Sequence, residues 1–85
     1  MHRKQPLRSI CKEIAALDHI KCTFNADTGE FRVTLDGLTT EREEAVAYYT
    51  EHPDDAMATA QYMSAFRSAE LRLAGHAFKD TIYAS

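Results

Sequence analysis

The sequence contains no tryptophan and has little glycine, proline or cysteine, with three, two and two of each in 85 residues. So few Gly and Pro residues, beside 45% hydrophobic and 27% charged ones, exclude a disordered chain and indicate a globular one. The length leaves room for one hydrophobic core, so we expect one small domain over residues 1–85. No apolar run approaches the roughly 20 residues that cross a bilayer, and no signal-peptide stretch follows the basic start. We therefore expect a cytoplasmic protein without a membrane contact.

The two cysteines, Cys11 and Cys22, are too few and wrongly spaced for a disulfide scaffold or a zinc site. Each falls on the apolar face of a predicted element, where a free thiol packs as a small hydrophobe. We therefore expect two buried free thiols. The four histidines are scattered, without a spacing that would bring two ligands to one metal ion, so no metal or other cofactor is expected.

Motifs of catalysis are also missing from the sequence. No serine lies in a nucleophile elbow, no Gly-rich phosphate loop is present, and turn or cap positions account for Gly29, Gly37 and Gly75. A chain this short has little volume for a concave active site. We therefore expect that the protein is not an enzyme.

Hydrophobic periodicity predicts a helix over about 7–18, preceded by a basic N-terminal arm at 1–6. From Ile20 the period changes from 3.6 to 2, which predicts a hairpin over 20–35. The segment Ala26-Asp27-Thr28-Gly29 has turn chemistry, and its glycine is expected to take the left-handed conformation that closes the loop.

The register of the hairpin follows from its alternation, because cross-strand partners must share a face. A four-residue loop at 26–29 places apolar residues opposite one another, pairing Phe24 with Phe31, Cys22 with Val33 and Ile20 with Leu35. The other face pairs Lys21 with Thr34, Thr23 with Arg32 and Asn25 with Glu30. We expect the first face to be buried and the second to be solvated.

Two more helices are predicted after the hairpin. Thr40, with Glu43 three residues later, has the form of a capping box and predicts a helix over about 40–52. Pro53 predicts either a new helix over about 54–78 or a kink in a single helix. Gly75 is a candidate C-terminal cap, and residues 81–83 fit either further helix or a strand beside the hairpin.

This order of elements predicts an α+β fold: helix, β-hairpin, helix and long helix, with the helices packed on one face of a small antiparallel sheet. A hairpin alone is marginally stable in water, so its apolar face must be covered by these helices or by a second copy of the chain.

The formal charge of −3 conceals an asymmetry along the chain. Residues 1–35 hold six basic and four acidic side chains, whereas residues 36–85 hold four basic and nine acidic ones. The basic residues of the first part define an alternative nucleic-acid surface: Arg3, Lys4, Arg8, Lys12, Lys21 and Arg32. The polar hairpin face carries no aromatic residue that could stack on bases, and a total charge this close to zero disfavours nonspecific nucleic-acid binding.

Three residues of the predicted helices are candidate contacts for a protein partner. Arg67 and Glu70 fall inside the apolar arc that contains Phe66 and Leu73, so they either pair with each other at the edge of the arc or meet a partner chain. Tyr48 projects away from the apolar stripe of the second helix, and Tyr is a frequent interface anchor.

The functional hypothesis from the sequence is a small non-catalytic protein that binds another macromolecule, an adaptor, inhibitor or regulator of the kind that bacteria and their phages encode. The partner is expected to be a protein, and a homodimer through the hairpin edges or the long helix is compatible with this hypothesis.

Overall fold

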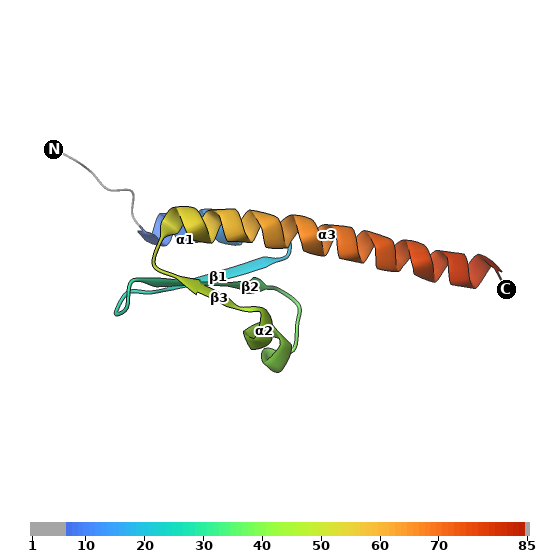
Figure 1. Cartoon of the computed structure of the whole chain (residues 1–85), viewed down its shortest axis with the longest axis horizontal. Coiled ribbons are helices and arrows are strands. Elements are labelled where there is room, and N and C mark those ends of the chain that lie inside the picture. The colour runs from blue at the N-terminus through green and yellow to red at the C-terminus, as the bar shows by residue number, and fades with distance from the viewer. Residues whose placement is uncertain (1–6, 85) are drawn as a thin grey trace.

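The computed structural model describes residues 7–84, with side chains described as far as Ala74. Its elements are helix α1 (Leu7–Ala15), strands β1 (Ile20–Asn25) and β2 (Glu30–Leu35), helix α2 (Thr40–Val46), strand β3 (Tyr48–Thr50) and helix α3 (Pro53–Ala84). The strands form one antiparallel sheet in the order β1-β2-β3. Figure 1 shows α1 and α3 on one side of this sheet and α2 beneath it. The predicted α+β fold is therefore confirmed.

The hairpin has the predicted register. Phe24 pairs with Phe31, and the other five pairs from Ile20–Leu35 to Asn25–Glu30 follow in step. Gly29 has a φ of +74°, the left-handed conformation expected of it, and its N–H donates to the carbonyl of Asn25 at 2.8 Å. The alternation of apolar and polar residues was sufficient to fix the pairing, because a slip of one residue would turn every side chain over.

Helix α1 ends three residues earlier than the predicted boundary at residue 18. The chain must turn from the helix into β1, and it does so through hydrogen-bonded turns after Ala15. His19 takes a φ of 67°, and its carbonyl accepts a hydrogen bond of 2.8 Å from the N–H of Asp36, just beyond β2. This turn fixes where α1 lies over the sheet. The predicted arm at 1–6 lies outside the described residues.

The predicted helix over 40–52 is wrong in its second half. Helix α2 ends at Val46, Ala47 is extended, and Tyr48–Thr50 pair with Val33, Arg32 and Phe31 as the third strand. The open edge of β2 supplies hydrogen-bond partners that the sequence alone does not reveal, and aromatic and β-branched residues suit a strand. The predicted capping box is also replaced, since the side chain of Thr39 accepts from the N–H of Arg42 at 3.3 Å.

Helix α3 begins at Pro53 and runs to Ala84 as one continuous helix. Gly75 does not end it, and residues 81–83 are helical rather than a strand. One glycine costs a helix interior about 1 kcal/mol, which is insufficient to end a long Ala-rich segment. In Figure 1 the helix continues well past the end of the sheet, so its later turns have no sheet beneath them.

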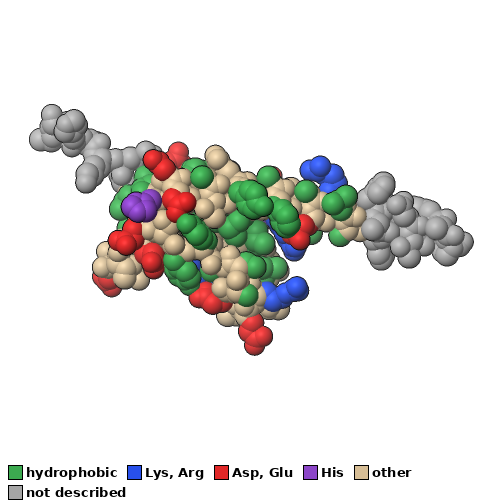
Figure 2. All heavy atoms as spheres, viewed as in Figure 1, with side chains coloured by type: hydrophobic (Ala, Val, Ile, Leu, Met, Phe, Trp, Pro, Cys, Tyr) green, Lys and Arg blue, Asp and Glu red, His purple; other side chains and the backbone are tan. Residues whose placement is uncertain are grey.

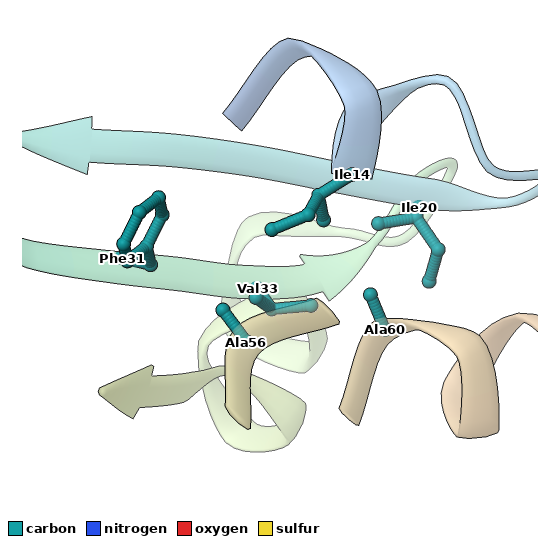
Figure 3. Packing of buried hydrophobic residues seen from close by; sticks show 6 residues of the cluster. All are labelled: Ile14, Ile20, Phe31, Val33, Ala56 and Ala60. Atoms are coloured by element: carbon teal, nitrogen blue, oxygen red, sulfur yellow. The ribbon is translucent and has the colours of Figure 1, made fainter. Parts of the chain in front are cut away.

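The core lies between the sheet and the two helices above it. Six residues are buried there, and Figure 3 shows them pointing toward one another: Ile14, Ile20, Phe31, Val33, Ala56 and Ala60. The Phe24 and Phe31 rings pack with centroids 4.9 Å apart. Ala56 and Ala60 are the residues through which α3 crosses β2, and their small side chains let the helix lie close to the strand.

Candidate functional site

An apolar groove of about 450 Å³ runs along α3 beside β3 and the end of α2. Apart from Thr59 and Glu70, its lining residues are aliphatic, aromatic or thioether side chains: Leu35, Val46, Tyr48, Tyr62, Met63 and Phe66. Figure 2 shows hydrophobic side chains gathered between α3 and the elements beneath it. A second hollow of about 190 Å³ shares Leu35, Val46 and Glu70 with the groove and extends it toward Arg42 and Arg67. We refer to the first hollow as the groove.

Strand β3 supplies one wall of the groove because its side chains alternate between the two faces of the sheet. Thr50 is buried opposite Phe31, and Tyr48, two residues earlier, shares that face and remains 40% exposed. The hydroxyl of Tyr48 donates a hydrogen bond of 2.7 Å to Asp55 in the first turn of α3. This bond raises the pKa of Tyr48 and lowers that of Asp55. Tyr48 is therefore held against α3, on a strand and not on the predicted helix.

Helix α3 supplies the other wall. Tyr62 and Phe66, one turn apart, stack with ring centroids 6.2 Å apart and remain 70% and 55% exposed. The periodicity predicts one broad apolar stripe that contains Phe66 together with Ala56 and Ala60, but the structure buries the two alanines and leaves Phe66 exposed. The two stacked rings expose apolar surface to water. Burial of that surface against a partner would stabilise the resulting complex.

The predicted contacts Arg67 and Glu70 pair with each other, with the guanidinium 3.6 Å from the carboxylate. Glu70 borders the groove, and both residues border the second hollow. The sequence left open whether they pair or meet a partner chain. The structure shows the first alternative, an ion pair between the two residues. Because the pair lies at the end of the groove, both side chains would still lie near a partner bound there.

The polar face of the hairpin is covered by α2 and is not the solvated surface that the sequence predicts. Glu43 accepts from Lys21 and from Arg32, each at 3.2 Å, and Glu44 lies 3.2 Å from the other terminal nitrogen of Arg32. Thr34 is buried, and its hydroxyl donates to the carbonyl of Glu43 at 2.7 Å. These bonds hold α2 against β2.

The hydrogen bonds between α2 and the polar face of the sheet form a network that shifts the pKa values of Glu43, Glu44 and Arg32. The bond from Lys21 lowers the pKa of Glu43 most, with Arg32 adding to it, although partial burial opposes the shift. The hydroxyl of Tyr49 donates to Glu44 and lowers the pKa of that carboxyl, again with help from Arg32. The bond to Tyr49 contributes most to raising the pKa of Arg32. Both carboxylates therefore take up protons at a lower pH than unpaired glutamates do.

The four described residues of the alternative nucleic-acid surface are not brought together. Lys21 and Arg32 are bound by the carboxylates of α2 on the polar face, whereas the exposed Arg8 and Lys12 belong to α1, which packs on the apolar face. The other two members, Arg3 and Lys4, lie outside the described residues. The four described basic residues therefore divide between the two sides of the sheet.

The side chains described, those of residues 7–74, contain no group of three or more His, Cys, Asp or Glu residues that could hold a metal ion. None of the helices within the described part of the chain is both long and apolar enough to cross a bilayer. Cys11 and Cys22 are free thiols, each half-buried at the edge of the core.

The groove could be anticipated from the sequence only in part. The chemistry of Tyr48 predicts a contact residue, whereas Tyr62 is not among the contacts predicted from the sequence. The i, i+4 spacing of Tyr62 and Phe66 is the local signal that points to the pair. Comparison of the chain with protein-family models, with curated proteins and with solved structures finds no match, so any function must be inferred from the groove itself.

Proposed function

We propose that this protein is a non-catalytic protein-binding module whose groove holds the apolar face of a helix from a partner protein. The observation that carries the proposal is the wall of Tyr62 and Phe66, exposed and stacked, facing a second wall that contains Tyr48. Exposed Tyr and Phe side chains in an apolar hollow are the usual anchors of a protein interface. Occupation of such a surface suits an adaptor, inhibitor or regulator.

The dimensions of the groove suit a helix as its occupant. Its lining residues on α3 run from Thr59 to Glu70, about three turns and roughly 16 Å of helix. A partner helix lying along this length would insert side chains spaced at i, i+3 or i+4, and i+7, as in other helix-in-groove complexes. The volume of about 450 Å³ accommodates a few aliphatic side chains.

Charge at the two ends of the groove defines the chemistry of the partner further. Asp55 lies at one end, next to the exposed Asp54 and Glu51, and Arg42 and Arg67 line the hollow at the other end. A complementary helix therefore carries basic residues near Asp55 and acidic residues near Arg67. Such pairs at the rim mainly set orientation and the rate of association.

The first test is selection from a displayed library of 15-residue amphipathic helices on the full-length protein. We expect the selected peptides to share aliphatic anchors at i, i+3 or i+4, and i+7, with opposite charges at their two ends. Their affinity should fall at least tenfold on Phe66→Ser and on Tyr62→Ser. Leu7→Ser is the matched control, because Leu7 is 39% exposed and lies outside the groove. Peptides that bind both groove variants as well as the wild type would overturn the proposal.

The second test places a photo-crosslinking phenylalanine analogue at position 66, and at position 7 as the control, in the native host. We expect position 66 to crosslink a protein whose attached peptide is an apolar helix, and position 7 not to do so. A product that contains two copies of this chain would identify a homodimer and contradict a separate partner. Equal crosslinking from both positions would contradict the groove as the binding site.

A further inference from the structure

We propose that Cys11 and Cys22 are an oxidation site, at which a small-molecule disulfide such as oxidised glutathione converts the two thiols into an intramolecular disulfide. Their Sγ atoms lie 3.3 Å apart, with the thiol of Cys11 donating to the sulfur of Cys22. A disulfide bond is about 2.05 Å long, so small rotations of the two side chains bring the sulfurs to bonding distance. Both residues are free thiols and neither is fully buried.

The two cysteines come from different elements that are packed together. Cys11 is in the middle of α1 and Cys22 is in β1, and both lie at the edge of the same core cluster. The intervening chain contains the turn in which His19 takes its positive φ. The fold therefore holds the two thiols within 3.3 Å of each other.

The environment of the pair bears on which thiol reacts first. Burial contributes most to raising the pKa of Cys22, and the neighbouring Cys11 adds to this effect. The thiolate is the nucleophile in disulfide exchange, so a raised pKa slows attack by Cys22. With Cys11 as the first attacker the reaction has two steps, and the reverse order gives the same disulfide and the same two glutathiones.

In the first step Cys11 attacks one sulfur of oxidised glutathione, forming a mixed disulfide and releasing one reduced glutathione. In the second step Cys22 attacks the Sγ of Cys11 and displaces the other glutathione, with loss of its own proton to solvent. One protein dithiol and one oxidised glutathione thus become one protein disulfide and two reduced glutathiones. No metal or further electron acceptor is needed.

The product would tie α1 to the sheet. In the reduced protein α1 is held by the packing of its side chains Ile10 and Ile14. A short amphipathic helix of this type is an element that can open locally. A covalent link from Cys11 to β1 removes that opening. No residue of α1 or β1 lines the groove, so this inference and the proposed function stand or fall separately.

The test incubates the full-length protein at neutral pH in glutathione buffers of increasing oxidised fraction and blocks the remaining thiols with an alkylating reagent. Tryptic cleavage after Lys12 and Lys21 places the cysteines in separate peptides, 9–12 and 22–32. We expect these two peptides to be recovered joined by a disulfide, reversibly on reduction. The joined form should appear at an oxidised fraction at least tenfold lower than in the same chain unfolded in urea.

Thermal unfolding and two variants complete the test. The oxidised wild type should melt higher than the reduced protein by on the order of 10 °C. Cys11→Ser and Cys22→Ser should show no such rise in the same buffers. Recovery of glutathione-capped or disulfide-linked dimeric chains in place of the joined peptides would overturn the proposal. So would formation of the disulfide only in the urea-unfolded chain, a result that does not depend on whether either variant folds.

Discussion

The guanidinium of Arg32 lies 3.2 Å from the carboxylate of Glu43, which joins the middle of β2 to helix α2. Arg32 also lies 3.2 Å from Glu44 and donates to the hydroxyl of Tyr49 at 3.3 Å, so one side chain connects α2, β2 and β3. Because α2 has no buried residue of its own, these polar bonds are its main attachment to the sheet. We expect Arg32→Ala to lower the melting temperature by about 5 °C. Arg8→Ala, on the exposed side of α1, should leave it unchanged by circular dichroism.

The same network predicts a particular response to acid. Glu43 and Glu44 have pKa values lowered from 4.5 in the folded protein, so their ion pairs contribute stability that is fully present above that value. The contribution is lost as the pH falls through the lowered folded values, where the carboxylates take up protons. We expect the melting temperature to fall as the pH drops below 4.5, and to fall less in the Glu43→Gln, Glu44→Gln double variant.

The control for the acid response is Glu41→Gln on the same helix, since Glu41 is exposed and takes no part in the ion pairs with Arg32 and Lys21. This variant should follow the wild-type curve in scanning calorimetry. If the double variant followed it too, α2 would be held by something other than its carboxylates.

The sequence predicts those parts of the fold that depend on a local pattern of residues or on pairing between two neighbouring strands. The alternation from Ile20 to Phe24 determines the register, and the turn chemistry places Gly29 in the left-handed conformation. Strand β3 could not be predicted in this way, because three residues are too few to show a period and their partner is the open edge of β2. Residues that are helical by local pattern are thus extended because of a contact distant in sequence.

The same limit applies to the candidate site. A helical wheel distinguishes the two sides of α3 only when the position of the sheet is known, and the sheet packs against Ala56 and Ala60 instead of Phe66. The ring of Phe66 therefore lines the groove rather than the core. The chemistry of Tyr48 suggested a contact residue, but its place in the groove depends on β3, which is a nonlocal feature.

The close approach of α3 to the sheet predicts that Ala60 does not tolerate a larger side chain. Ala60 is fully buried at this contact, whereas Ala65 is exposed on the same helix. We expect Ala60→Leu to lower the free energy of unfolding by about 1–3 kcal/mol, because the added atoms must push the helix away from the core. Ala65→Leu should change it by less than about 0.5 kcal/mol in urea titrations. Equal effects would mean that α3 does not pack on the sheet through Ala60.

Substitution of Gly29 in the hairpin turn is expected to destabilise the protein through the backbone conformation alone. A Cβ added to Gly29 would meet no atom within 4 Å, but the φ of +74° at this position disfavours any residue with a Cβ. We therefore expect Gly29→Ala to lower the free energy of unfolding by about 1 kcal/mol. Thr28→Ala, exposed in the same loop, is the control for urea titration. A neutral Gly29→Ala would show that the loop can adopt another turn.

Substitutions at the two adjacent tyrosines of β3 distinguish an effect on binding in the groove from an effect on the stability of the sheet. The ring of Tyr48 lines the groove, and that of Tyr49 lies on the opposite face with its hydroxyl on Glu44. We expect Tyr48→Ala to weaken a selected helical peptide at least tenfold in fluorescence anisotropy, because the wall facing Phe66 is lost. Tyr48→Phe keeps the ring and should retain most of the affinity, although it loses the bond to Asp55. Tyr49→Ala should destabilise the attachment of α2 and lower the affinity much less than Tyr48→Ala, because Val46 is the one residue of α2 that lines the groove. An equal loss of affinity in both alanine variants would show that the peptide responds to the integrity of the sheet and not to the groove.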